Sequence, residues 1–353
     1  MSRGLGDVYK RQGEWIMKKL KSLISIALVA VMSLLGAGCS SKDSGLDKIK
    51  LAEVTHSVFY APQYVAIEQG FFKDEGIEVE LLGAQGADKT MAALLSGEVQ
   101  IGLMGPEASI YVYNQGSKDY SICFAQLTKR DGSFIVGREP NDNFTFDDLK
   151  GKEILGGRKG GVPEMTLEYG IKNSGLVIGE DTANGEVNVR TDIQFGVMAG
   201  AFTGGEGDYV TLFEPLATSI EKEGSGYIMT SVGQETGEIP FTAYSALGSY
   251  IEQNADLIQR FTNAVYKGQQ FVQTHPAEEI AKIISPHFTE LSLEDLTTVV
   301  ARYKEIDAWC QDPVLKEESL TRLMDVMELA GELNERAPYN EIVTTKYAEK
   351  AMK

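Results

Sequence analysis

The chain is poor in the residues that metal sites, disulfide frameworks and nucleophilic catalysis commonly use. Its 353 residues include 3 Cys, 3 His and 2 Trp. Three cysteines are too few for a disulfide framework, and they lack metal-ligand spacing. We expect Cys123 and Cys310 to be buried free thiols. The glycine-rich stretch 204–207 is not followed by Lys and Ser or Thr, so it is no phosphate-binding Walker loop. The sequence therefore predicts that the protein binds no metal and no cofactor and that it is not an enzyme.

Basic residues are also scarce, with 33 Lys and Arg against 51 Asp and Glu. Without residues 1–38, which hold six bases and two acids, the chain keeps 27 bases and 49 acids, a net charge of −22. A protein with this much negative charge does not bind nucleic acid by neutralising its phosphates, and it has no basic patch that could bind anionic lipid. The remaining 315 or so residues are enough for one or two well-cored domains.

No apolar run is long enough to span a bilayer. The run 23–35 is shorter than the ~20 residues that a membrane-spanning helix needs. It follows the basic segment 17–21 and precedes Gly-Ala-Gly and Cys39, an order typical of a lipoprotein signal peptide. We expect lipid on Cys39 to hold the mature protein on the extracytoplasmic face of the cell membrane. An ordinary secretory signal is the alternative, because Gly36 stands where lipoprotein signals usually carry Leu.

The body of the chain shows an alternating β and α pattern. A β-rich run, a loop and a helix bounded by Gly or Pro occur three times from residue 48 onward. The expected strands are 49–54, 77–82 and 99–104, and Met91, Leu94 and Leu95 are expected on one helix face. Such units give a parallel sheet with right-handed crossovers. Further expected elements are strands 120–127, 133–137, 153–156, 208–213 and 241–247, and a helix 296–309 capped by Ser292 and Asp295.

These elements predict an α/β chain of two lobes, each with a mixed and mainly parallel sheet. The chain is expected to cross between the lobes near residues 132 and 239. Residues 1–16 are interpreted as an artefactual or miscalled start, 17–38 as the signal peptide and 39–47 as a flexible linker. Lobe one is predicted to consist of residues 48–132 and 239–353, including a helical C-terminal extension. Lobe two is predicted to consist of residues 133–238.

Several segments carry a resemblance to a known family. Residues 60–79 read YAPQYVAIEQGFFKDEGIEV and residues 94–102 read LLSGEVQIG, and Phe213-Glu214-Pro215 follows a strand. Together with 241–246, these segments resemble solute-binding proteins of the nitrate, sulfonate, taurine and thiamine-pyrimidine-precursor family of bacterial ABC importers. The resemblance implies a type II periplasmic-binding fold with solute held between two hinged lobes, and as partners a membrane permease and its ATPase. The binding protein itself is expected to be a monomer.

Ligand contacts are expected where loops follow the carboxyl ends of the strands. Tyr60 offers a ring and a hydroxyl, Arg158 a positive charge, and Glu107 and Glu214 carboxylates that accept from N–H groups. Three of these residues have a structural alternative: core packing for Tyr60, a solvated loop charge for Arg158, and compensation of a helix dipole for Glu107. The candidate ligand-binding residues are His56, Ser57, Tyr60, Gln85, Glu107, Arg158, Gly161, Gln194, Phe195 and Glu214.

The two carboxylates favour a nitrogen-containing, pyrimidine-like solute with N–H donors. An anion such as nitrate, taurine or another sulfonate is the alternative, with Arg158 as its partner. Two further hypotheses are an enzyme similar to the yeast pyrimidine synthase and a solute-loaded accessory of a sensor kinase. The former is disfavoured because the cysteine-rich motif of that synthase is missing.

Overall fold

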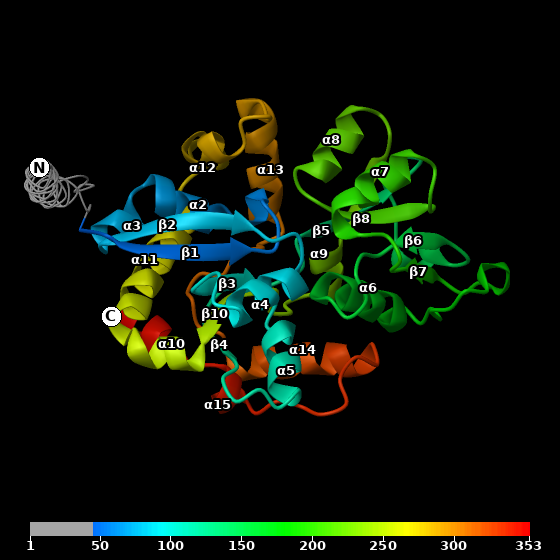
Figure 1. Cartoon of the computed structure of the whole chain (residues 1–353). Coiled ribbons are helices and arrows are strands. Elements are labelled where there is room, and N and C mark those ends of the chain that lie inside the picture. The colour runs from blue at the N-terminus through cyan, green and yellow to red at the C-terminus, as the bar shows by residue number, and fades with distance from the viewer. Residues whose placement is uncertain (1–44) are drawn as a thin grey trace, which may run out of the picture. The chain divides into compact units, whose positions relative to one another are not determined.

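The computed structural model describes residues 45–353, and residues 47–353 form one compact unit. The predicted signal peptide, most of the linker and Cys39 lie outside the described residues. Two five-stranded sheets organise the compact unit (Figure 1). The predicted fold class, two lobes each built on a mixed α/β sheet, is confirmed.

The first sheet has the strand order β2-β1-β3-β10-β4. Strand β1 pairs in parallel with β2 and β3, and β10 runs antiparallel between β3 and β4. The three predicted βα units are present, although Leu95 is 43% exposed while Met91 and Leu94 are buried. The elements of this region are β1 Asp47–Glu53, η1 Val58–Tyr60, α2 Ala61–Glu68, α3 Phe71–Asp74, β2 Ile77–Gly83, α4 Ala87–Leu95, β3 Ile101–Met104, α5 Glu107–Asn114 and β4 Ser121–Thr128.

The second sheet has the order β7-β6-β8-β5-β9. Here β6 pairs in parallel with β7 and β8, and β5 runs antiparallel to β8 and β9. Strand β9 was not predicted, and four of its five residues are only partly buried. The elements are β5 Ser133–Gly137, η2 Phe146–Leu149, β6 Glu153–Leu155, α6 Val162–Asn173, η3 Thr182–Asn184, β7 Asn188–Arg190, η4 Phe195–Val197, α7 Met198–Thr203, β8 Tyr209–Phe213, α8 Leu216–Lys222, β9 Tyr227–Ser231 and α9 Val232–Thr236.

The chain passes between the sheets after β4 and again before β10, and the predicted crossings at residues 132 and 239 fall in these two segments. The remaining elements form the helical C-terminal region. They are β10 Thr242–Leu247, α10 Gly248–Gln253, α11 Ala255–Thr274, α12 Ala277–Ile284, η5 Ser285–His287, α13 Leu293–Glu305, α14 Glu317–Leu329, α15 Tyr339–Ile342 and α16 Lys346–Ala351.

The Ser292 half of the predicted cap is present, because the Ser292 hydroxyl accepts the Asp295 N–H at 3.1 Å. Helix α13 begins at Leu293, three residues before the predicted start, and the described residues show no return bond from the Asp295 side chain to Ser292. The predicted end of this helix at Trp309 is wrong. The helix ends at Glu305, and Asp307 takes a left-handed conformation with φ 52°. This turn sends Trp309 back into the core, where its indole N–H donates to the Phe59 carbonyl at 2.9 Å.

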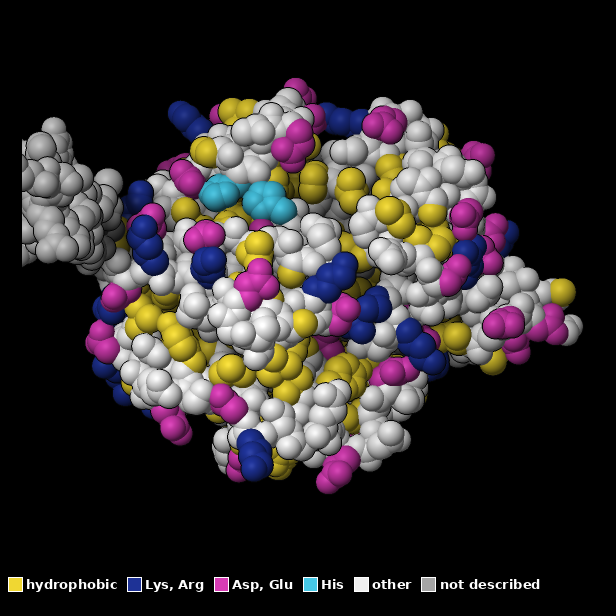
Figure 2. All heavy atoms as spheres, in the orientation of Figure 1, with side chains coloured by type: hydrophobic (Ala, Val, Ile, Leu, Met, Phe, Trp, Pro, Cys, Tyr) yellow, Lys and Arg dark blue, Asp and Glu magenta, His cyan; other side chains and the backbone are white. Residues whose placement is uncertain are grey.

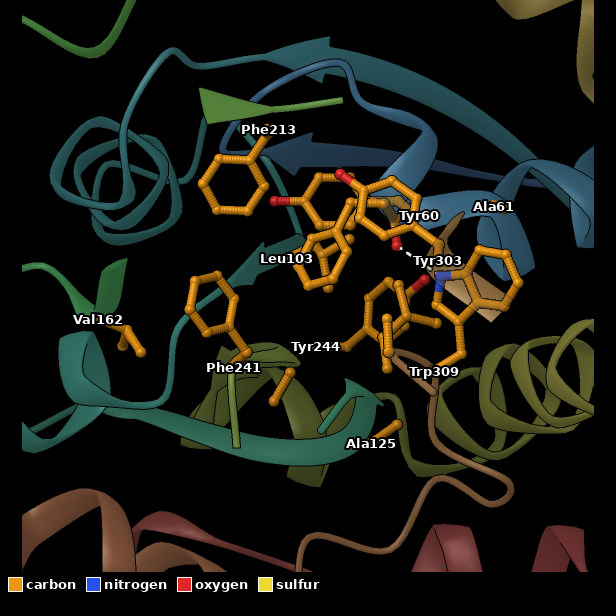
Figure 3. Packing of buried hydrophobic residues seen from close by; sticks show 14 of the residues in the cluster. Tyr60, Ala61, Leu103, Ala125, Val162, Phe213, Phe241, Tyr244, Tyr303 and Trp309 are labelled. Carbon is orange, nitrogen blue, oxygen red and sulfur yellow. Dashed lines mark hydrogen bonds between the residues drawn. The ribbon is translucent and has the colours of Figure 1, made fainter. Parts of the chain in front are cut away.

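One aromatic cluster joins the lobes. Phe59 from the first lobe lies with its ring centroid 5.5 Å from that of Phe213 and 5.2 Å from that of Tyr303. Figure 3 shows Tyr303 and Trp309 at one side of this cluster and Phe213 and Phe241 at the other. The side with Phe213 and Phe241 borders the candidate site.

Candidate functional site

A cavity of about 530 Å³ lies between the two sheets. Its lining comes from loops that follow β1, β2, β3, β6 and β7, and from ends of β8 and β10. This is where open α/β sheets bind ligands, because the carboxyl ends of parallel strands meet at one edge. Its volume falls in the usual range for small-molecule sites, ~300–1,000 Å³.

Aromatic rings form one wall of the cavity. Tyr60 enters from the first loop and is 3% exposed, and Phe195 comes from the loop after β7. The Phe213 centroid lies 5.7 Å from that of Phe195 and 5.9 Å from that of Phe241. Rings at these separations pack as tilted pairs and leave apolar faces for a planar solute.

Glu107 is the most unusual group in the lining. It begins α5 and is 1% exposed, and its Oε2 atom has no hydrogen-bond partner among the described residues. Its carboxylate folds back over Gly105 so closely that a Cβ at that position would lie 1.9 Å from Oε2. Glycine at 105 therefore makes room for the Glu107 side chain.

Burial raises the pKa of the Glu107 carboxyl to about 7. The positive charge of Arg158 and nearby backbone N–H groups, including that of Val162 in the second lobe, act in the opposite direction but do not cancel the burial effect. A buried carboxylate without a full set of donors carries a large desolvation cost.

The rim of the cavity holds the basic side chains. Arg158 follows β6, and its Nε lies 3.6 Å from Asp88 Oδ1 of the facing lobe, with both side chains about half exposed. Lys89 also contributes to the lining. On the face shown in Figure 2, Lys and Arg side chains gather where the two lobes meet. Gln85 nearby adopts a left-handed φ of 62°, which aims the loop after β2 at the cavity.

The structure brings many of the sequence-predicted residues together but not all. Tyr60, Glu107 and Arg158 line the same cavity. So do the other candidates Gln85, Gly161, Gln194 and Phe195.

His56, Ser57 and Glu214 lie outside this lining. The His56 ring bonds to Glu53 Oε1 and to the His287 carbonyl, each at 2.8 Å, so it ties the first loop to η5. The Ser57 hydroxyl donates to the Glu214 carbonyl at 2.8 Å. These contacts give all three residues structural partners within the protein.

Glu214 is fully occupied by protein donors. Its carboxylate accepts from Arg302 Nη1 at 2.9 Å, from the Thr218 hydroxyl at 2.7 Å and from the Thr218 N–H at 2.9 Å. Arg302 belongs to α13 in the C-terminal region, while Glu214 and Thr218 belong to the second lobe. This contact therefore joins α13 to the second lobe.

Sequence reasoning missed several residues of the lining. Phe213 and Phe241 were noted only as members of family-like segments, and Lys89, Thr211 and Asp192 were not considered. The available signal was position, because Phe213 is the last residue of β8 and Phe241 precedes β10.

Three further observations concern the cysteines, the possible metal ligands and the helices of residues 45–353. Cys123 and Cys310 are buried and free, as predicted. No group of three or more His, Cys, Asp or Glu side chains in this range is arranged to hold a metal ion. Over the same residues, every helix is too short or too polar to traverse a lipid bilayer.

The two sheets with a cavity between them define a fold of the periplasmic-binding-protein type. A ligand-binding component of an ABC-type import system from Staphylococcus aureus, solved with zinc bound, superposes with TM-score 0.67 at 16% identity, covering 86% of this chain and 99% of that chain. The alkanesulfonate-binding protein SsuA from Xanthomonas axonopodis pv. citri, solved bound to MOPS, gives TM-score 0.65 at 14% identity, covering 84% and 98%.

The chain belongs to the NMT1/THI5-like family, whose sequence model matches residues 58–279. It is 44% identical over 314 residues to the "Putative binding protein YtlA" of Bacillus subtilis (strain 168), covering 89% of this chain and 92% of that protein. It is 25% identical over 242 residues to the 4-amino-5-hydroxymethyl-2-methylpyrimidine phosphate synthase of Aspergillus parasiticus, covering 65% and 68%. The resemblance seen in the sequence is thus confirmed for family and fold.

Proposed function

We propose that this protein is the extracytoplasmic solute-binding component of an ABC importer and that its solute is a small amino-heterocycle of the pyrimidine type. The observation that carries the proposal is Glu107, a buried carboxylate with an unpartnered oxygen beside a wall of aromatic rings. An aromatic amine can donate to this oxygen while its ring stacks on Phe195 or Phe213. The pyrimidine named for the fungal relative belongs to this chemical class.

Capture by lobe closure follows from the two-sided lining. Groups from both lobes reach the cavity, and contacts between the lobes already exist at its edge, such as the bond from the Tyr111 hydroxyl to the Gly160 carbonyl at 3.1 Å. Closure expels water and strengthens each polar contact with the solute. The closed form would then be presented to a membrane permease that is driven by an ATPase.

The test is binding by calorimetry and thermal shift, with aminopyrimidines, flavins, nitrate and sulfonates as probes. We expect an aminopyrimidine to bind in the micromolar range, about −8 kcal/mol. Glu107→Gln should weaken this binding 10- to 100-fold because one oxygen acceptor is replaced by a donor, whereas Glu214→Gln leaves the cavity lining intact. Binding of nitrate or taurine alone, unaffected by Glu107→Gln, would overturn the proposal in favour of a simple anion carrier.

Membrane attachment through Cys39 is the second part of the proposal. It rests on the signal-peptide pattern of residues 17–38, and on an acidic body that does not itself attract anionic lipid. Metabolic labelling with a palmitate analogue should mark the wild-type protein and leave Cys39→Ser unlabelled. A wild-type protein that is exported without label would show an ordinary secretory signal.

A further inference from the structure

Arg158 is a cation at the cavity with few firm partners. Its Nε is 3.6 Å from Asp88 Oδ1, beyond hydrogen-bond distance, and its Nη1 donates to the Lys159 carbonyl at 3.3 Å. A guanidinium offers five N–H donors in a planar fork that matches carboxylate, sulfonate or phosphate oxygens. Most of this capacity is unused by the described residues.

Glu107 and Arg158 face the same cavity without pairing with each other. The charge of Arg158 lowers the pKa of the Glu107 carboxyl, yet no guanidinium nitrogen of Arg158 lies within 4.0 Å of a Glu107 carboxylate oxygen, the limit for an ion pair. Two opposite charges in one partly enclosed space attract more strongly than in water. Both side chains line the cavity, and neither charge is paired with the other.

The other charges of the lining do not change this arrangement. Asp192 is held by Arg190 through two contacts of 2.9 and 2.7 Å, so it is already neutralised. Lys89 forms no ion pair among residues 45–353 and adds positive charge on the same rim as Arg158. The cavity therefore has a carboxylate in its buried part. Its rim holds Lys89 and Arg158, and the ion pair of Arg158 with Asp88 is about half exposed and longer than a hydrogen bond.

We propose that the solute is dipolar, with an N–H donor that binds Glu107 and an anionic group, carboxylate, sulfonate or phosphate, that binds Arg158 in place of Asp88. This inference rests on the proposed function and narrows it to amino-heterocycles that carry an acidic substituent. It also explains why one cavity contains partners for both solute classes that the sequence left open.

The experiment compares matched ligands on the purified full-length protein. The probes are 4-aminopyrimidine acids with zero, one and two methylenes between ring and carboxylate, their neutral amides, and unsubstituted 4-aminopyrimidine. Calorimetry should give at least one acid that binds 10- to 100-fold more tightly than its amide. In Arg158→Gln the acid should lose this advantage, while the affinity for the amide stays within about twofold.

Lys159→Gln is the matched control. This neighbouring side chain is 69% exposed, pairs with Glu332 at 3.6 Å and does not line the cavity. Its loss removes one positive charge from the same loop and should leave the preference for the acid unchanged. An equal fall in both variants would show a general field effect and overturn the role of Arg158.

The remaining outcomes separate this inference from the proposed function. Equal binding of acids and amides in the wild type would overturn the dipolar solute and leave the amino-heterocycle in place. Failure of every probe to bind would overturn both. Binding of an acid that persists in Glu107→Gln and vanishes in Arg158→Gln would also overturn the dipolar solute, because only the anionic end would then be recognised.

Discussion

Glu107 and Glu214 are two buried glutamates at similar places in the two lobes, and they have opposite surroundings. Each follows a central strand, β3 or β8, and each is 1% exposed; Glu107 begins α5, and Glu214 lies two residues before α8. Glu214 accepts three hydrogen bonds from Arg302 and Thr218, whereas Glu107 Oε2 accepts none from the described residues. Whether a carboxylate at a strand end is saturated with hydrogen bonds or keeps an oxygen without a partner thus depends on the donors that other elements bring to it.

The largest effect is expected when Glu214, which joins α13 to the second lobe, is replaced by alanine. Glu214→Ala should lower the free energy of unfolding by about 3 kcal/mol, since it breaks a buried charge pair and leaves Arg302 with Glu221 and the Thr218 hydroxyl as its partners. Urea unfolding at pH 7.5 measures the loss. Glu107→Gln is the matched comparison and should be neutral or stabilising at this pH. Equal losses in the two variants would mean that both carboxylates are structural.

This difference between the glutamates shows how far the sequence could predict the site. Gly and Pro boundaries located the βα units, and the rule that ligands bind beyond strand ends identified Tyr60, Glu107 and Arg158 as residues of one cavity. The same rule also selected Glu214. Its partner Arg302 lies 88 residues further along the chain, on a helix whose packing against the second lobe has no local signal.

His56 teaches the same lesson in the first lobe. Its position in the loop after β1 suggested a ligand contact, but its ring stacks on Phe288 with centroids 4.9 Å apart and bonds to the His287 carbonyl. Both partners come from the helical C-terminal region, and no local sequence pattern signals the contact of this region with the first loop. For His56 and Glu214 alike, the contacts come from residues far along the chain, which sequence periodicity does not reveal.

The pH dependence of stability gives the next largest expected effect. The folded-state pKa of Glu107 is about 7, above its ordinary 4.5, so the folded state holds this proton more tightly than the unfolded chain. The contribution of this carboxyl group to the free energy of unfolding is therefore fully present below about pH 4.5 and is lost as the pH rises to about 7. Across this pH window, the free energy of unfolding of Glu107→Gln should rise relative to that of the wild type by at most about 3 kcal/mol. Urea unfolding of both proteins at pH 5 and pH 8 checks the sign, and a constant difference would contradict it.

The close contact between Gly105 and Glu107 provides a milder change. A Cβ at residue 105 would meet Glu107 Oε2 at 1.9 Å, so Gly105→Ala should push the carboxylate from its position and weaken solute binding roughly 10-fold, about 1.4 kcal/mol. Calorimetry with the best aminopyrimidine measures this. Gly200→Ala is a suitable control, because this helical glycine in α7 has no atom within 4 Å of the added Cβ. Unchanged affinity in Gly105→Ala would show that the carboxylate position does not matter for binding.

The smallest expected effect concerns the second carboxylate on Arg302. Glu221 accepts from Arg302 Nη2 at 2.6 Å, but its side chain is 34% exposed while that of Glu214 is fully buried. Water can replace a partly exposed partner, so Glu221→Ala should cost about 0.5–1 kcal/mol, well below the loss in Glu214→Ala. Urea unfolding in low salt and in 0.5 M salt distinguishes the Arg302–Glu221 pair from the Arg302–Glu214 pair, because salt screens the exposed pair more than the buried one. A loss as large as that of Glu214→Ala would mean that Arg302 itself, and not the burial of Glu214, holds α13 on the second lobe.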